Sequence, residues 1–120
     1  MKFCWCTIGV KDLEKSIKFY KEILGLPVCK RFSAGPKMEI CFMGEGETKV
    51  ELVCGSDYKA KNDAKAVSLG FEVKSVEETI AFIKEKGLKV DDGPYQPNPH
   101  IKFFYIKDPD GISIRLVENL

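Results

Sequence analysis

The chain has 120 residues, of which 44% are hydrophobic and 31% are charged, and its formal net charge is +1. This length suits one domain, and the near-neutral charge argues against nucleic acid or an acidic membrane surface as the main partner. No apolar stretch approaches the roughly 20 residues that span a bilayer, and residues 1–12 are typical of a strand rather than a signal peptide. We therefore expect a soluble, cytoplasmic protein.

The first expected strand lies in the segment FCWCTIGV, residues 3–10. Side chains alternate between the two faces of a strand, so Trp5 and Thr7 share one face and Cys4 and Cys6 share the other. The two cysteines do not predict a zinc site, because no second Cys or His pair completes four ligands. The odd number of five cysteines, most of them in apolar runs, predicts reduced thiols in the core.

The most informative feature is an internal repeat. Residues 10–28, VKDLEKSIKFYKEILGLPV, resemble residues 73–90, VKSVEETIAFIKEKGLKV, at an offset of about 63 positions. Both segments have the apolar spacing of an amphipathic helix. Asp12 is the expected N-cap of the first helix, and Ser75 with Glu78 forms the capping-box pattern of the second.

Segments that predict strands surround each of these helices. One such segment precedes each helix and three follow it, separated by turns rich in Gly and Pro. The expected fold is therefore α+β, a single domain over residues 1–120 made of two βαβββ repeats, 1–55 and 66–120, with a linker at 56–65. A helix covers only one face of each sheet, so we expect the two uncovered faces to form a curved cleft of mixed sheets.

Four side chains are expected to converge in this cleft. By the repeat offset, Trp5 corresponds to Ser68, and Glu51 in TKVELVCG corresponds to Arg115 in ISIRLV. A guanidinium cannot shed its charge, and a carboxylate at hydrogen-bond distance offsets most of the cost of burying it. Arg115 is thus expected to pair with Glu51; the alternative is a wide, wet cleft in which both charges are solvated.

The duplicated pattern and two motifs, DLEKSIKFYKEILGLPV and DPDGISIRLVE, resemble the vicinal oxygen chelate superfamily. Its members include glyoxalase I, extradiol dioxygenases and bleomycin resistance proteins. The resemblance implies the glyoxalase/bleomycin-resistance-like fold over the whole chain, and commonly a homodimer. It also implies a divalent metal held at four strand positions, typically by His or Gln, Glu, His and Glu.

Carried over onto this sequence, those four positions fall on Trp5, Glu51, Ser68 and Arg115, and only Glu51 is a ligand of the expected kind. An indole N–H has no lone pair to offer and a guanidinium repels a cation. We therefore expect no metal and no cofactor, unless Glu51 is joined by unexpected ligands. His100, the only histidine, is expected at the surface, with a ligand contact or proton shuttle as the alternative.

These residues suggest two classes of function. The first is a binding protein whose aromatic cleft takes an aromatic or anionic small molecule; the expected contacts are Trp5, Thr7, Glu51, Ser68, Arg115, His100 and Phe104. The second is a lyase or isomerase of the glyoxalase I type, with Glu51 as general base and Arg115 stabilising an enolate. A carboxylate tied to Arg115 is a weak base, which favours the binding protein. A third possibility is a dimerisation or regulatory module with a vestigial cavity.

Overall fold

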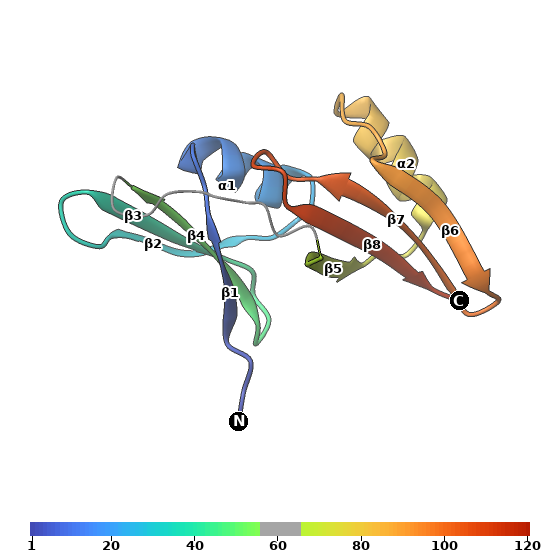
Figure 1. The fold of residues 1–120 in the computed structure, drawn as a ribbon, viewed down its shortest axis with the longest axis horizontal. Coiled ribbons are helices and arrows are strands. Elements are labelled where there is room, and N and C mark those ends of the chain that lie inside the picture. Colours follow the sequence, from blue (N-terminus) through green and yellow to red (C-terminus); the bar gives the residue numbers. More distant parts are fainter. Residues whose placement is uncertain (56–65) are drawn as a thin grey trace. The chain divides into compact units, whose positions relative to one another are not determined.

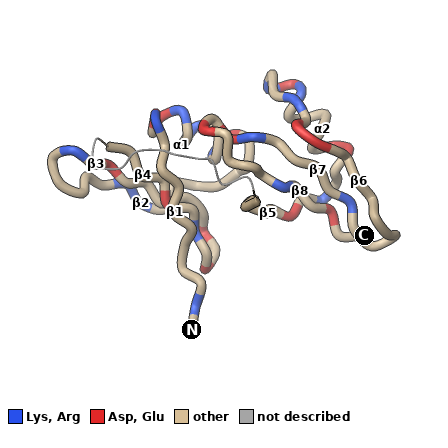
Figure 2. Tube along the Cα trace, viewed as in Figure 1, with Lys and Arg blue, Asp and Glu red and all other residues tan. Residues whose placement is uncertain are grey.

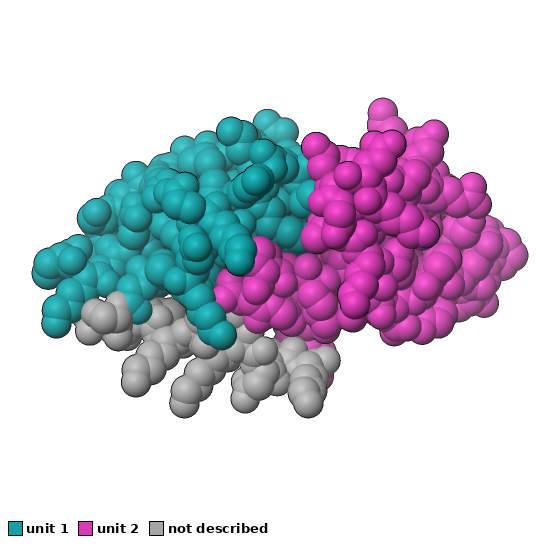
Figure 3. All heavy atoms as spheres, turned by 90° about the horizontal axis from the view of Figure 1, so that it is seen from above, with its two compact units in different colours: residues 1–62 teal, residues 63–120 magenta. Residues whose placement is uncertain are grey.

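The computed structural model describes residues 1–55 and 66–120, and the chain divides into two compact units, residues 1–62 and 63–120 (Figures 1 and 3). The linker expected at residues 56–65 lies outside the described residues. No helix in the described part of the chain is long and apolar enough to cross a membrane. Basic and acidic residues are interspersed along both units, as Figure 2 shows.

The first unit contains one helix and a four-stranded mixed sheet. Its elements are, in chain order, β1 (Trp5–Gly9), α1 (Leu13–Glu22), β2 (Val28–Ser33), β3 (Met38–Met43) and β4 (Lys49–Gly55). The strands lie in the order β1-β4-β3-β2, with β1 parallel to β4 and the other pairs antiparallel.

The second unit repeats this arrangement. Its elements are β5 (Ser68–Glu72), α2 (Val76–Glu85), β6 (Asp92–Asn98), β7 (Ile101–Lys107) and β8 (Ser113–Asn119). The strands lie in the order β5-β8-β7-β6, and again only the pair that involves the first strand, β5 with β8, is parallel. The two βαβββ modules expected from the repeat are therefore confirmed.

Both helices begin where the capping residues predict. The Asp12 carboxylate accepts a hydrogen bond from the Lys15 amide at 3.1 Å, and the Ser75 hydroxyl accepts one from the Glu78 amide at 3.2 Å. Each bond satisfies an amide that has no partner within the first turn of its helix. These local contacts determine the residue at which each helix begins.

In each unit the helix covers one face of the sheet, and most of the core lies between them. In the first unit Ile40, Phe42 and Val53 form a second buried cluster on the other face of the sheet. In the first unit Arg31 of β2 contacts Glu14 of α1, so its cross-strand row, which includes the fully buried Cys41 and Leu52, faces the helix. In the second unit Lys102 of β7 pairs with Glu77 of α2 at 3.2 Å. The even-numbered residues of β7 and β8 therefore face α2, and the fully buried ones are Phe104, Ile106 and Ile114. We call the other sheet face of each unit its open face.

The cysteines correct one expectation from the sequence. All five are free, but only Cys41 is buried; Cys4 and Cys29 are exposed, and Cys6 and Cys54 are half-buried. Cys29 is exposed because β2 forms one edge of its sheet and every residue of that strand is exposed. The expectation that the thiols lie in the core is therefore wrong for all but Cys41.

Candidate functional site

On the open face of the first unit, one row of side chains crosses all four strands. The strand register pairs Thr7 with Glu51, Glu51 with Phe42, and Phe42 with Lys30. Directly opposed residues share a face and lie about 5 Å apart. The Thr7 hydroxyl donates to Glu51 Oε1 at 2.5 Å, which holds the carboxylate in a defined position.

Aromatic rings surround this row. The Trp5 ring lies edge-on to Phe42, with centroids 5.3 Å apart, and Phe32 stacks on the other side of Phe42 at 6.3 Å. The Lys30 ammonium lies 4.9 Å from the centroid of the Phe42 ring. Trp5 is 49% exposed and Phe32 is 42% exposed, so two of the three rings present apolar surface to a ligand.

The second unit carries the equivalent row with its charges reversed. Here the register pairs Gly70 with Arg115, Arg115 with Tyr105, and Tyr105 with Asp92. The position of Glu51 is thus taken by Arg115, that of Lys30 by Asp92, and the aromatic position is kept. Both rows place an aromatic ring between a cation and a carboxylate, but in opposite order.

Arg115 is held by aromatic rings rather than by acids. Its Cζ lies 3.8 Å from the centroid of the Phe103 ring and 5.7 Å from that of Tyr105. Its Nε is buried and has no hydrogen-bond partner in the described part of the chain. The other arginine, Arg31, contrasts with it: Arg31 bonds both Glu14 and Glu39 on the helix side of its sheet. Residues 66–120 supply no carboxylate partner for Arg115.

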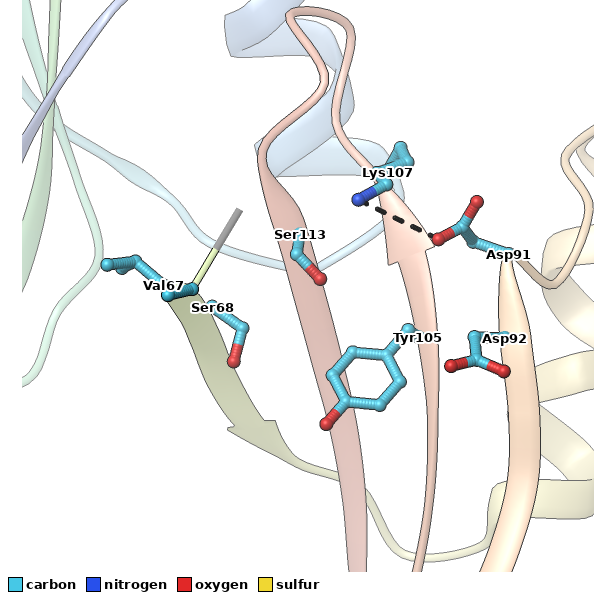
Figure 4. A pocket seen from close by; sticks show the side chains of 8 residues that line it. Val67, Ser68, Asp91, Asp92, Tyr105, Lys107 and Ser113 are labelled. Carbon is cyan, nitrogen blue, oxygen red and sulfur yellow. Dashed lines mark ion pairs between the residues drawn. The ribbon is translucent and has the colours of Figure 1, made fainter. Parts of the chain in front are cut away.

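A pocket of about 320 Å³ lies on the open face of the second unit, near Arg115 (Figure 4). Lys107 and Asp91 form an ion pair across one side of it at 3.7 Å. Asp92 accepts a hydrogen bond from the Tyr95 hydroxyl, and this bond raises the pKa of Tyr95, so the phenol stays protonated as a donor. The residues that line the pocket are Ala66, Val67, Ser68, Asp91, Asp92, Tyr105, Lys107 and Ser113.

The structure groups most of the residues expected at the site within their own units. Trp5, Thr7 and Glu51 share the open face of the first unit. Ser68 and Arg115 share that of the second, since Ser68 pairs with Ser113, two residues before Arg115. The convergence of Glu51 with Arg115 in one cleft stays a prediction.

Phe104 and His100 lie elsewhere. Phe104 is fully buried and pairs with Leu116 on the face that α2 covers, so it does not line the open face. This corrects the expectation that Phe104 contacts the ligand. His100 is exposed in the turn between β6 and β7, where its amide bonds the side chain of Asn98. Five residues separate it from Tyr105 along β7, a distance of about 16 Å in an extended strand.

Sequence reasoning missed Phe103, Tyr105 and Asp92. A signal for the first two was present in the strand IKFFYIK. Tyr105 and Lys107, which carry polar groups, have the same parity as Phe103, whereas Phe104 and Ile106 are wholly apolar; Lys102 is the exception on the parity of Phe104. Polar residues at alternate positions indicate which face of a strand is accessible to solvent. In this strand they place Phe103, rather than Phe104, on the accessible face.

The residues at the four metal positions implied by the fold do not fit a divalent cation. Glu51 is already bonded to Thr7, and neither Trp5 nor Arg115 can act as a ligand. Within residues 1–55 and 66–120, no three His, Cys, Asp or Glu side chains lie close enough together to hold a metal.

Comparison with known families agrees with the geometry. The profile of the Glyoxalase/Bleomycin resistance protein/Dioxygenase superfamily matches residues 2–116. The chain belongs to this superfamily. The resemblance noted in the sequence and the glyoxalase-like α+β fold are thereby confirmed.

Relatives of this superfamily member span its whole length. The uncharacterized protein YraH of Bacillus subtilis is 30% identical and covers 100% of both chains. A probable lactoylglutathione lyase of Vibrio cholerae is 32% identical over 93% of this chain and 86% of its own. Among solved structures, the trypanothione-dependent glyoxalase I of Leishmania major has a TM-score of 0.79 at 28% identity, covering 98% of this chain and 86% of that one. TnmS3, an antibiotic-binding protein from Streptomyces sp. CB03234, has a TM-score of 0.79 at 22% identity, covering 100% and 97%.

Proposed function

We propose that this glyoxalase-family protein binds an aromatic or anionic small molecule through its open faces, without the metal centre typical of the superfamily. The observation that carries the proposal is Arg115. Its guanidinium lies over the ring of Phe103, and its Nε is buried. Residues 66–120, the described part of its unit, offer that Nε no hydrogen-bond partner and the guanidinium no carboxylate.

An arginine in this position needs an anion. The guanidinium stays charged at every physiological pH, and buried donors in folded proteins are almost always hydrogen-bonded. Stacking on Phe103 covers one flat side of the group but leaves its N–H edge, which matches the geometry of a carboxylate or phosphate. A ligand oxyanion supplies the missing acceptor, as does Glu51 if the two units meet as expected.

The open face of the first unit offers a second surface, one that suits an aromatic ligand. Half-exposed aromatic rings give large contact area at low entropic cost, and binding sites are commonly lined by them. Trp5 and Phe32 provide this surface beside Lys30. The superfamily includes small-molecule-binding proteins, of which the antibiotic-binding TnmS3 is one.

Titration with benzoate and benzamide tests the proposal, because the two differ mainly in charge. We expect benzoate to shift amide resonances of β7 and β8 with EDTA present. We expect Arg115→Gln to weaken benzoate at least ten-fold and to leave benzamide unchanged. Arg31→Gln is the matched control, since Arg31 already has two carboxylate partners, and it should leave both affinities unchanged. Benzoate binding that is insensitive to Arg115→Gln contradicts the proposal.

A lyase or isomerase of the glyoxalase I type is the second candidate. It is supported by the probable lactoylglutathione lyases that are about 32% identical over most of the chain. In this function Glu51, oriented by Thr7, acts as general base, and Arg115 stabilises the developing enolate.

Turnover of a hemithioacetal tests this alternative. Isomerisation by the purified protein, measured with and without added nickel or zinc, should be absent if the protein only binds. Activity that Glu51→Gln abolishes and Glu45→Gln leaves intact favours the enzyme, because Glu45 is an exposed loop residue outside the row.

A further inference from the structure

Three hydroxyl groups around the pocket of the second unit have no hydrogen-bond partner among the described residues. They belong to Ser68, Ser113 and Tyr105, and none donates or accepts a hydrogen bond within residues 1–55 and 66–120. Figure 4 shows the three side chains around the same pocket, with Asp92 on the far side of Tyr105 from Ser68. Hydroxyls that line one cavity without a described partner are available to a ligand with complementary polar groups.

The chemistry of this lining fits a polyhydroxylated molecule. A ligand hydroxyl needs both a donor and an acceptor nearby, and protein hydroxyls serve as both. Asp92 adds a strong acceptor and Lys107 a strong donor. The face of the Tyr105 ring offers an apolar surface for the C–H groups of a sugar.

The charge of the pocket determines which end of the ligand enters it. Asp91 and Asp92 outweigh Lys107, which is already paired with Asp91. A negative group is therefore disfavoured inside the pocket and favoured beside Arg115. Tyr105 joins the two places, because it lines the pocket and its ring centroid lies 5.7 Å from Arg115 Cζ. One six-membered sugar ring with an acidic substituent is of a size to span about that distance.

We propose that the ligand is an acidic carbohydrate, a sugar that carries a carboxylate or a phosphate. The hydroxyls occupy the pocket of Ser68, Ser113 and Tyr105, and the acidic group binds Arg115. This inference rests on the proposed function for the acidic group, whereas the pocket is an independent observation. The volume of about 320 Å³ falls within the range of small-ligand sites.

Two matched carboxylates separate the inference from the proposed function. Glucuronate and cyclohexanecarboxylate share a six-membered ring and an acid, but only glucuronate has hydroxyls; glucose and glucose 6-phosphate complete the set. We expect glucuronate or glucose 6-phosphate to bind at least ten-fold more tightly than glucose in NMR titrations. The double variant Ser68→Ala/Ser113→Ala should weaken that binding at least five-fold and leave cyclohexanecarboxylate unchanged. Ser33→Ala, on exposed β2 of the other unit, is the control.

The outcomes distinguish two failures. If Arg115→Gln weakens both carboxylates but the serine variants weaken neither, the carbohydrate inference is overturned and the proposed function stands. If Arg115→Gln affects neither carboxylate, the proposed function itself is overturned. Tighter binding of glucosamine than of glucuronate also overturns the inference, because the pocket then selects a cation.

Discussion

Two adjacent phenylalanines on β7 have opposite environments, and this difference can be measured. Phe104 is fully buried on the side of α2, whereas Phe103 is half-buried beneath the guanidinium of Arg115. We expect Phe104→Ala to lower the free energy of unfolding by about 3–5 kcal/mol, because it leaves a cavity in the core. Phe103→Ala should cost about 1–2 kcal/mol. Urea unfolding followed by circular dichroism measures both.

For ligand binding, we expect the substitution of Phe103 to matter more than that of Phe104. Phe103→Ala removes the ring that orients Arg115, and a cation–π contact of about 0.5–2 kcal/mol corresponds to a roughly 3–30-fold loss in affinity for benzoate. Phe104→Leu, which keeps an apolar core side chain, should leave that affinity unchanged. A larger loss of binding in Phe104→Leu than in Phe103→Ala would show that the faces of β7 are assigned incorrectly.

At the residue scale, sequence reasoning succeeded where neighbours along the chain decide the outcome. Trp5 and Thr7 are predicted on one face of β1 because side chains alternate along a strand, and the register places Glu51 opposite Thr7 on that face. Phe104 was misplaced because its face depends on how β7 pairs with β8, and the pairing register is a non-local property. The pairing of Asp92 with Tyr105 could not be predicted for the same reason.

At the scale of elements, the helix caps give a second prediction. The Asp12 and Ser75 side chains each satisfy one amide of the first turn. Asp12→Ala and Ser75→Ala should each lower the free energy of unfolding by about 1 kcal/mol. The caps lie in different units, so the double variant should show the sum of the two losses. Asp12→Asn and Ser75→Thr keep an acceptor and are the controls; equal losses in these variants would contradict a capping role.

The hairpin of β2 and β3 is joined to α1 through Arg31, which predicts a dependence on pH. The hydrogen bond from Arg31 lowers the pKa of Glu39 below its ordinary value of 4.5. The folded state then binds its proton less readily than the unfolded state, so this contribution to stability is complete above about pH 4.5. It is lost as the pH falls through the lowered pKa.

Thermal unfolding of Glu39→Gln measures this effect. At pH 7 we expect the midpoint to fall by roughly 1–4 °C, a small change because both partners are solvent-exposed. The difference from the unmodified protein should shrink between pH 4 and pH 2. Glu45→Gln should show no difference at either pH. A deficit in Glu39→Gln that is the same at pH 7 and pH 2 would mean that packing, not charge, is responsible.

Elements were the most predictable level of this fold. The caps, the helical spacing and the repeat are local patterns, and they located both helices and all eight strands of the described residues. The cysteines were less predictable: most lie in apolar runs, which predicted core thiols, but only Cys41 is buried. Cys29 is exposed on β2, a sheet edge, and edge position follows from the order of strands in space.

At the scale of the whole molecule, the reversed charges of the two rows carry the remaining prediction. Lys30, Phe42 and Glu51 follow one order in the first unit, and Asp92, Tyr105 and Arg115 follow the opposite one in the second. Two related faces of opposite polarity attract each other where identical faces would repel. This pattern is what the expected pairing of Glu51 with Arg115 requires.

A double-mutant cycle measures that pairing directly. Glu51→Gln and Arg115→Gln are compared singly and together by urea unfolding. A direct bidentate pair predicts a coupling energy of about 1–3 kcal/mol, so that the double variant loses less than the sum of the single losses. Thr7→Val with Arg115→Gln is the control, because Thr7 contacts Glu51 but carries no charge. If the losses in unfolding free energy of Glu51→Gln and Arg115→Gln are strictly additive, the two residues do not pair. The acceptor for Arg115 is then the anion of a ligand, and Arg115→Gln should affect ligand affinity rather than stability.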